Sequence, residues 1–202
     1  MKKVTLLGDS IRLLGYGKRV AESLASECEV FQPEENCRFA KHTLRGIYDW
    51  RKGMEGSAVV HWNNGLWDTC DLYGDGAFTE EEEYVKNMLR IAEMLKSRYG
   101  TVIFATTTPV TQANRHNNNA TIARYNELLV PKLKERGILI NDLYSAVIAD
   151  LDRYICEDTI HLSEAGSELC ADLTVRSIRE ALAQTGEENN GIASADGIGA
   201  PV

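Results

Sequence analysis

A serine close to the start of the chain has the type and position of a nucleophile. Ser10 stands in the segment Gly8-Asp9-Ser10, directly after a short apolar run at positions 4–7. At the first step of a helix that follows a strand, a serine can cap the helix, bind an anion at the positive end of the helix dipole, or attack a carbonyl carbon. To act as a nucleophile it needs a base, because its hydroxyl is weakly reactive at neutral pH.

One of the four histidines is placed to be that base. His161 follows Asp158 by three positions and precedes Ser163, which can cap the helix expected after it. A tight turn can bring the carboxylate to one imidazole nitrogen and leave the other nitrogen free, as a serine nucleophile requires. The remaining histidines are expected on a helix surface, in a buried strand and in a polar loop, in the order His42, His61 and His116.

These motifs resemble the SGNH hydrolases, which are also called the GDSL esterase/lipase family. The resemblance rests on GDS at 8–10, on an Asn-Gly segment after the third apolar run, and on DTIH at 158–161, and it extends over about residues 1–183. It implies a flavodoxin-like fold and hydrolysis of a small-molecule ester through an acyl-enzyme. It implies no metal and no organic cofactor.

By this resemblance, Ser10 is the nucleophile, His161 is the general base and then the general acid, and Asp158 orients the imidazole. Asp9 is not part of this triad. We expect its side chain to brace the turn before Ser10 by hydrogen bonding.

The family takes one donor of its oxyanion hole, the set of groups that stabilises the reacting oxygen, from an asparagine in a GxND segment after the third strand. In this chain the segment reads HWNNGLWDT and places Trp67 where that asparagine is expected. We therefore expect Asn64 to supply the amide, since it adjoins the flexible Gly65, with Asn63 as the alternative. Both asparagines could instead only shape the turn.

The family takes a second donor from a glycine after the second strand, and this chain departs from that pattern too. The segment QPEENCRFAKHTLRG contains no glycine before Gly46. Asn36 or Arg38 could donate to the substrate or to the oxyanion in its place. Alternatively, Asn36 caps a helix over residues 37–50, and Arg38 is an ordinary solvated side chain.

The elements that must position these residues alternate along the chain. Apolar runs of strand length lie at 4–7, 28–31, 58–62, 102–106 and 137–141, and helical patterns lie at 11–26, 37–50, 80–99, 118–136 and 163–183. The runs are continuously apolar, which suits strands covered on both faces. The alternation predicts a three-layer α/β/α domain with a five-stranded parallel sheet, and Ser10 falls at the carboxyl edge of that sheet, where ligands bind.

Length and composition limit the possibilities. A chain of 202 residues, 44% of them hydrophobic, suits one domain, which we place at 1–184, with a small, polar and glycine-rich tail at 185–202 predicted to be disordered. The net charge of −8 argues against a nucleic-acid partner. Five widely spaced cysteines without a CxxC pair argue against a disulfide framework or a zinc site and favour reduced thiols.

The expected compartment is the cytoplasm. The apolar stretch at the N-terminus is too short for a signal peptide, and no run approaches the length of a membrane span. The oligomeric state cannot be read from the pattern. One functional alternative stays open, a non-catalytic α/β module that binds an anionic small molecule. A dinucleotide-binding protein is disfavoured because the GxGxxG spacing is absent.

Overall fold

A parallel five-stranded sheet forms the centre of the molecule, as predicted. The computed structural model describes residues 1–193, with side chains up to residue 184. The strands lie in the order β2-β1-β3-β4-β5 and all pair in parallel. They are β1 (Lys2–Leu7), β2 (Cys28–Phe31), β3 (Ser57–Asn63), β4 (Thr101–Ala105) and β5 (Leu139–Asn141).

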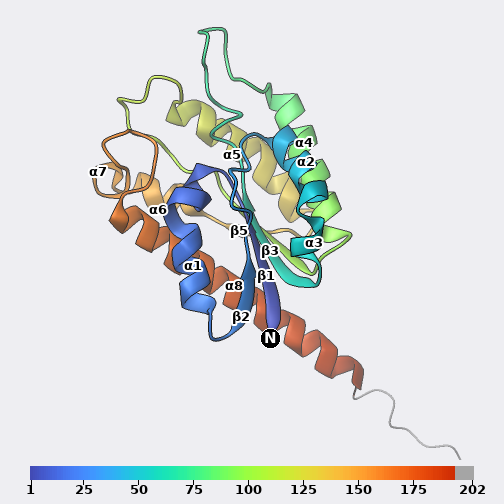
Figure 1. Cartoon of the computed structure of the whole chain (residues 1–202). Helices are drawn as coiled ribbons and strands as arrows, with labels where there is room; N and C mark the ends of the chain where they lie inside the picture. The colour runs from blue at the N-terminus through green and yellow to red at the C-terminus, as the bar shows by residue number, and fades with distance from the viewer. Residues whose placement is uncertain (194–202) are drawn as a thin grey trace, which may run out of the picture.

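Helices cover both faces of this sheet (Figure 1), so the predicted three-layer α/β/α architecture is confirmed. On one face pack η1 (Ile11–Tyr16), a π-helical segment, together with α1 (Gly17–Leu24), α6 (Leu143–Ile148) and α8 (Glu164–Ala193), while α7 (Leu151–Tyr154) packs against α8. On the other face lie α2 (Ala40–Asp49), α3 (Arg51–Met54), α4 (Glu81–Lys96) and α5 (Asn119–Lys134).

The core has two halves because successive strand residues point to opposite faces of the sheet. Leu6 and Ile103 belong to the half under α1 and α8, whereas Leu7 and Phe104 belong to the half under α2, α4 and α5. Trp62 is fully buried in this second half, with its ring 4.8 Å from that of Phe104. Both faces of each strand therefore need apolar residues, which explains the continuous runs in the sequence.

Two predicted helix boundaries are wrong. The backbone of α8 continues to Ala193, whereas the sequence pattern placed its end near residue 183. The tail predicted to be disordered, 185–202, overlaps the end of this helix, and 194–202 lie outside the described residues. Helix α2 begins at Ala40 instead of residue 37, because the cap that starts it comes from a distant part of the chain.

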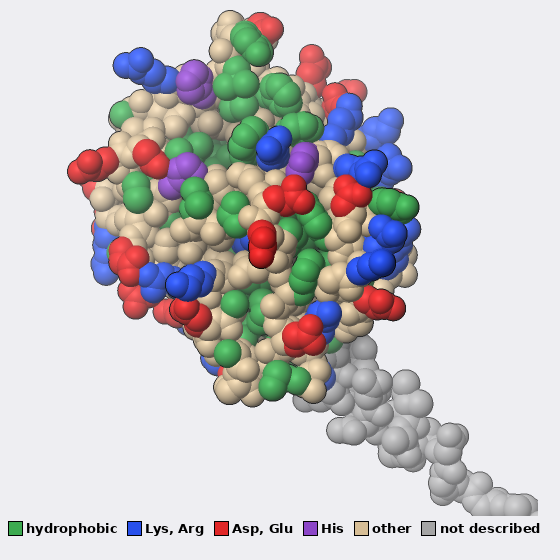
Figure 2. Space-filling model, viewed as in Figure 1, with side chains coloured by type: hydrophobic (Ala, Val, Ile, Leu, Met, Phe, Trp, Pro, Cys, Tyr) green, Lys and Arg blue, Asp and Glu red, His purple; other side chains and the backbone are tan. Residues whose placement is uncertain are grey.

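The loops after the strands gather at one end of the molecule, and the loop after β3 projects from it (Figure 1). A group of apolar side chains is exposed at this end, and acidic and basic side chains are interspersed over the whole visible face (Figure 2). None of the helices within residues 1–193 combines the length and apolar composition that crossing a membrane requires.

Candidate active site

The turn that carries Ser10 leaves the sheet through a position where only glycine fits. A Cβ on Gly8 would lie 2.1 Å from Oδ1 of Asn63, and the Gly8 carbonyl accepts a 3.0 Å hydrogen bond from the backbone N–H of Cys37. Ser10 then stands at the start of η1, yet its side chain makes no capping hydrogen bond. The interpretation of Ser10 as a helix cap is therefore wrong. Short π-helical segments of this kind occur frequently at functional sites.

The hydroxyl of Ser10 bonds instead to the predicted histidine. Nε2 of His161 lies 2.8 Å from Oγ of Ser10, and Nδ1 lies 2.7 Å from Oδ2 of Asp158. All three side chains are partly open to solvent at the carboxyl edge of the sheet. The fold thus brings together the end of β1 and the loop before α8, and the three residues singled out in the sequence form one continuous hydrogen-bonded chain.

Asp158 is held as an acceptor. Its Oδ1 accepts the backbone N–H groups of Ile160, at 3.1 Å, and His161, at 2.9 Å. Partial burial raises the pKa of Asp158, but the hydrogen bonds from His161 and Ile160 outweigh it and leave the pKa below the usual value. An ionised carboxylate favours a proton on Nδ1 of the imidazole, which leaves Nε2 able to accept the serine proton.

A buried polar network braces the turn from below. Oδ1 of Asp9 accepts the N–H of Ile11 at 3.0 Å and Nδ2 of Asn63 at 2.8 Å, and the hydroxyl of Tyr16 donates to Oδ1 of Asn63 at 2.8 Å. The expectation that Asp9 braces the turn is confirmed. Burial raises the pKa of Asp9 to about 6, against the opposing effect of the hydrogen bonds from Asn63 and Ile11.

The loops after β2 and β3 contact each other through Arg38 and Asn64, and we call this pair of loops the wall of the site. Nδ2 of Asn64 donates to the carbonyl of Arg38 at 2.7 Å, and Oδ1 of Asn64 accepts the hydroxyl of Thr43 at 2.9 Å. The side chain of Asn64 is fully buried. An amide nitrogen carries two hydrogens, and Nδ2 of Asn64 has one acceptor among the described residues. Asn63, by contrast, is hydrogen-bonded to Asp9 and Tyr16 in the buried network next to the serine turn.

Arg38 takes a backbone conformation that favours glycine. Its φ is 51°, in the left-handed region, while its side chain is exposed. Its N–H donates to Oδ1 of Asn36 at 2.7 Å, so Asn36 stabilises this turn and the interpretation of Asn36 as the cap of the following helix is wrong. The sequence singled out Arg38 as a possible donor but did not predict this conformation, because nothing in the residue type signals a positive φ.

Asp68 is a further residue that the sequence analysis missed. It is fully buried, and its carboxylate accepts the N–H of Ala40 at the start of α2, 3.0 Å from Oδ2. Burial raises the pKa of Asp68 to about 7. A signal was present, since an acid directly follows the short turn after the third apolar run, but its partner lies 28 positions away.

The loop after β4 supports the same wall. The hydroxyl of Thr107 donates to the carbonyl of Asn64 at 2.8 Å, and a Cβ on Gly65 would lie 2.0 Å from that hydroxyl. Gly65 also has a φ of 147°, so both its conformation and its surroundings require glycine. The hydroxyl of Thr106 donates to Asp142 at 3.0 Å. These two threonines satisfy backbone and side-chain acceptors around the site.

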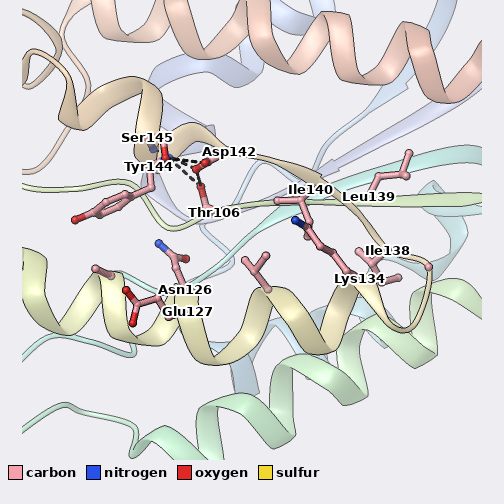
Figure 3. A pocket seen from close by; sticks show the side chains of 13 residues that line it. Thr106, Asn126, Glu127, Lys134, Ile138, Leu139, Ile140, Asp142, Tyr144 and Ser145 are labelled. Atoms are coloured by element: carbon pink, nitrogen blue, oxygen red, sulfur yellow. Dashed lines mark hydrogen bonds between the residues drawn. The ribbon is translucent and has the colours of Figure 1, made fainter.

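Several cavities lie near these loops. One of about 400 Å³ adjoins the triad and is lined by residues 113–117 and 158–160. Another of about 770 Å³ lies between α5 and the β5 edge of the sheet (Figure 3), and no residue of the triad lines it. Within the part of the chain that the structure describes, no group of three or more His, Cys, Asp or Glu side chains could hold a metal ion.

Comparison with known proteins finds esterases and acylhydrolases similar to this chain. No protein-family model matches the chain. GDSL esterase/lipase WDL1 from Oryza sativa is 29% identical over 187 residues, covering 83% of this chain and 72% of that protein. Among solved structures, a lipase/acylhydrolase from Enterococcus faecalis superposes with a TM-score of 0.75 at 20% identity, covering 89% of this chain and 96% of that chain. The acetyl xylan esterase AlAXEase superposes with a TM-score of 0.75 at 19% identity, covering 87% and 99%.

The chain is therefore similar to GDSL esterases/lipases, which supports the resemblance to the SGNH hydrolases. The solved structures share its fold.

Proposed function

We propose that this chain is a serine esterase in which Ser10, His161 and Asp158 form the catalytic triad. The similarity of the chain to GDSL esterases/lipases supports hydrolysis of ester bonds. The observation that carries the triad is the pair of contacts on one imidazole, 2.8 Å to the serine hydroxyl and 2.7 Å to the carboxylate. This is the geometry that activates a serine.

The reaction follows from these contacts. Nε2 of His161 takes the proton of Ser10 as Oγ attacks the carbonyl carbon of the ester, and the Asp158 carboxylate stabilises the imidazolium that forms. The imidazolium then protonates the departing alcohol, which leaves an acyl group on Ser10. A water molecule, deprotonated by the same nitrogen, attacks this acyl-enzyme and releases the acid.

The negative oxygen formed in each step needs hydrogen-bond donors. We assign the backbone N–H of Ser10 and the second amide hydrogen of Asn64 to this role, the latter because Nδ2 of Asn64 has a single acceptor among the described residues. The left-handed turn at Arg38 holds the carbonyl that orients this amide. Such preorganised donors typically lower the barrier by several kcal/mol.

The substrate class is a small-molecule ester of the carboxylesterase or carbohydrate acetylesterase type. Trp67 is 40% exposed in the loop after β3, and Phe78 is exposed with its ring 5.6 Å from that of Phe39. Exposed aromatic side chains in the loop after β3, at the same end of the molecule as the loop that carries Ser10, suit a sugar ring or a short acyl chain. The similarity of the fold to an acetyl xylan esterase supports the same class.

A panel of p-nitrophenyl esters of increasing chain length and acetylated sugars tests the proposal. We expect hydrolysis of short acyl esters by the wild type and loss of at least about 10³-fold in kcat for Ser10→Ala and His161→Ala. A fluorophosphonate probe should label Ser10 in the wild type. No hydrolysis and no labelling would favour instead a module that binds an anionic small molecule, and full activity in Ser10→Ala would exclude the triad.

A further inference from the structure

The loop that joins Asp158 to His161 contains a strained residue. Thr159 has a φ of 74°, in the left-handed region, where a β-branched side chain is a rare outlier. Such a conformation persists only where the surroundings hold it, and strained residues cluster at functional sites. Because Thr159 directly follows Asp158, its φ sets the direction in which the chain turns back toward His161.

Two hydrogen bonds from the loop after β4 hold this residue. The N–H of Thr111 donates to the carbonyl of Thr159 at 3.0 Å, and Nδ2 of Asn114 donates to Oγ1 of Thr159 at 3.0 Å. The N–H of Thr159 itself donates to the carbonyl of Cys156 at 2.9 Å. The loop after β4 therefore holds both the backbone and the side chain of Thr159 by hydrogen bonds.

The cavity of about 400 Å³ lies between these two loops, since residues of both line it. The two loops are therefore not closely packed against each other along their whole length. The hydrogen bonds between them consequently contribute more to fixing the loop that joins Asp158 to His161. Oδ1 of Asn114 accepts the N–H groups of His116 and Asn117, at 3.0 Å and 2.7 Å, so the donor side of its amide is oriented toward Thr159.

We propose that Asn114 is a positioning residue for the His161–Asp158 pair, and that it acts through the hydroxyl of Thr159. The proposal rests on the triad described above. A glycine at 159 would adopt the same φ without strain but would offer no hydroxyl to hold. A threonine at this position has a strained backbone, but its hydroxyl lets the loop after β4 form a hydrogen bond one residue away from Asp158.

Substitutions at position 159 separate the hydroxyl from the strain. Thr159→Val keeps the shape and the strain but removes the hydroxyl, so we expect kcat to fall by about 10- to 100-fold, as for a small misplacement of a catalytic group, with KM within about twofold. Thr159→Ser keeps the hydroxyl and should retain kcat within about threefold. Thr159→Gly removes both hydroxyl and strain and should retain more activity than Thr159→Val.

Asn114→Ala provides the second arm of a double-mutant cycle. Alone it should lower kcat at least as much as Thr159→Val, because it removes the same bond and also the acceptor for the N–H groups of His116 and Asn117. The double variant should lose no more than about twofold beyond Asn114→Ala, because the bond between Asn114 and Thr159 is already absent there. Gln112→Ala, an exposed residue of the same loop, is the matched control and should keep wild-type kcat. Thermal unfolding of each variant identifies any that fail to fold.

A spectroscopic measurement reports on the imidazole without turnover. The low-field proton resonance of Nδ1–H in His161 should shift or broaden in Thr159→Val and in Asn114→Ala, and should remain in Thr159→Ser. An unchanged resonance and unchanged kcat in Thr159→Val, alongside an inactive Ser10→Ala, would overturn this inference and leave the triad intact. A raised KM with unchanged kcat would also overturn it, since Thr159 would then contact substrate. Full activity in Ser10→Ala would overturn the triad itself.

Discussion

Several polar side chains around Ser10 are fully buried and form hydrogen bonds. Arg12 shows this best, since it is completely buried and its guanidinium donates to the carbonyls of Pro33, at 2.8 Å, Glu35, at 2.9 Å, and Gly8, at 3.2 Å. One side chain thereby fixes the serine turn to the loop after β2. Arginine suits this role because its planar group carries five donors in a fixed arrangement.

Replacing Arg12 therefore tests how firmly the turn is fixed. Arg12→Met fills a similar volume but removes the guanidinium donor from the carbonyls of Pro33 and Glu35, while the Gly8 carbonyl keeps the N–H of Cys37. We therefore expect the free energy of unfolding to fall by about 3 kcal/mol. Urea unfolding measures it. Arg45→Met is the control, because Arg45 is exposed and its contacts, an ion pair with Asp49 one helical turn away and a stacking contact with the Tyr48 ring, are at the surface. It should change stability by less than about 0.5 kcal/mol.

Asn64 offers a test of the oxyanion donor. Asn64→Ala should lower kcat by about 10²- to 10³-fold with little change in KM, as expected for a group that acts only in the transition state. Thr43→Val removes the hydroxyl that bonds to Oδ1 of Asn64 but leaves the amide in place. It should cost far less activity. Equal losses in the two variants would assign Asn64 a packing role instead.

Among the elements, α2 begins without a local cap. Phe39 stands at its N-cap position and makes no side-chain hydrogen bond, and Asp68, from the loop after β3, bonds to the N–H of Ala40 instead. A carboxylate at this end of a helix also interacts favourably with the helix dipole. The start of α2 and the wall that holds Asn64 are consequently tied to each other.

This cap can be removed without altering the apolar core. Asp68→Ala should lower the free energy of unfolding by about 1–2 kcal/mol, the usual cost of losing a helix cap. Asp68→Asn keeps an acceptor for Ala40 and avoids burying a charge, so at pH 8, above the raised pKa of Asp68 of about 7, it should be at least as stable as the wild type. Chemical unfolding at pH 8 distinguishes the two. Equal losses would show that the charge itself is required.

The elements could be predicted from the sequence to different extents. All five strands and the long helices carry sustained apolar patterns, and the sequence placed each of them within a few residues apart from the end of α8. The helices α3, α6 and α7 were missed because four to six residues are too few for a period to be visible. The start of α2 was misplaced because its cap lies 28 positions away.

The site was predictable where local chemistry defines it. Ser10, His161 and Asp158 could be singled out because the spacing of an acid and a histidine within one turn is visible in the sequence. The φ of Arg38 and of Thr159 was not, since surrounding hydrogen bonds impose these conformations against the preference of the residue type.

For the molecule as a whole, buried titratable groups shape the dependence of stability on pH. Burial raises the pKa of Asp9 from 3.8 to about 6, so the folded state holds this proton more tightly than the unfolded state. The stabilisation from that proton is complete below about pH 4 and is lost as the pH rises through 6. Burial lowers the pKa of His61 to about 3, which acts in the opposite direction as the pH falls below 6.5.

A comparison of Asp9→Asn with the wild type isolates the first effect. The stability of the variant relative to the wild type should rise between pH 4 and pH 6 by about 3 kcal/mol and then level off, which corresponds to a pKa shift of about two. Urea unfolding across this range measures the difference. A difference that does not vary with pH would mean that Asp9 has an ordinary pKa in the folded protein.

The contact between Ser10 and His161 joins positions 151 residues apart in the chain. Contacts of such long range form late in folding, because the entropy of closing a large loop must be overcome before they contribute. The nucleophile is synthesised near the beginning and its base near the end, so a nascent or truncated chain that ends before Asp158 holds an unreactive serine. Recovery of hydrolysis during refolding should therefore lag behind the return of helical circular dichroism. The rate at which hydrolysis recovers reports when the segment that carries His161 docks beside Ser10.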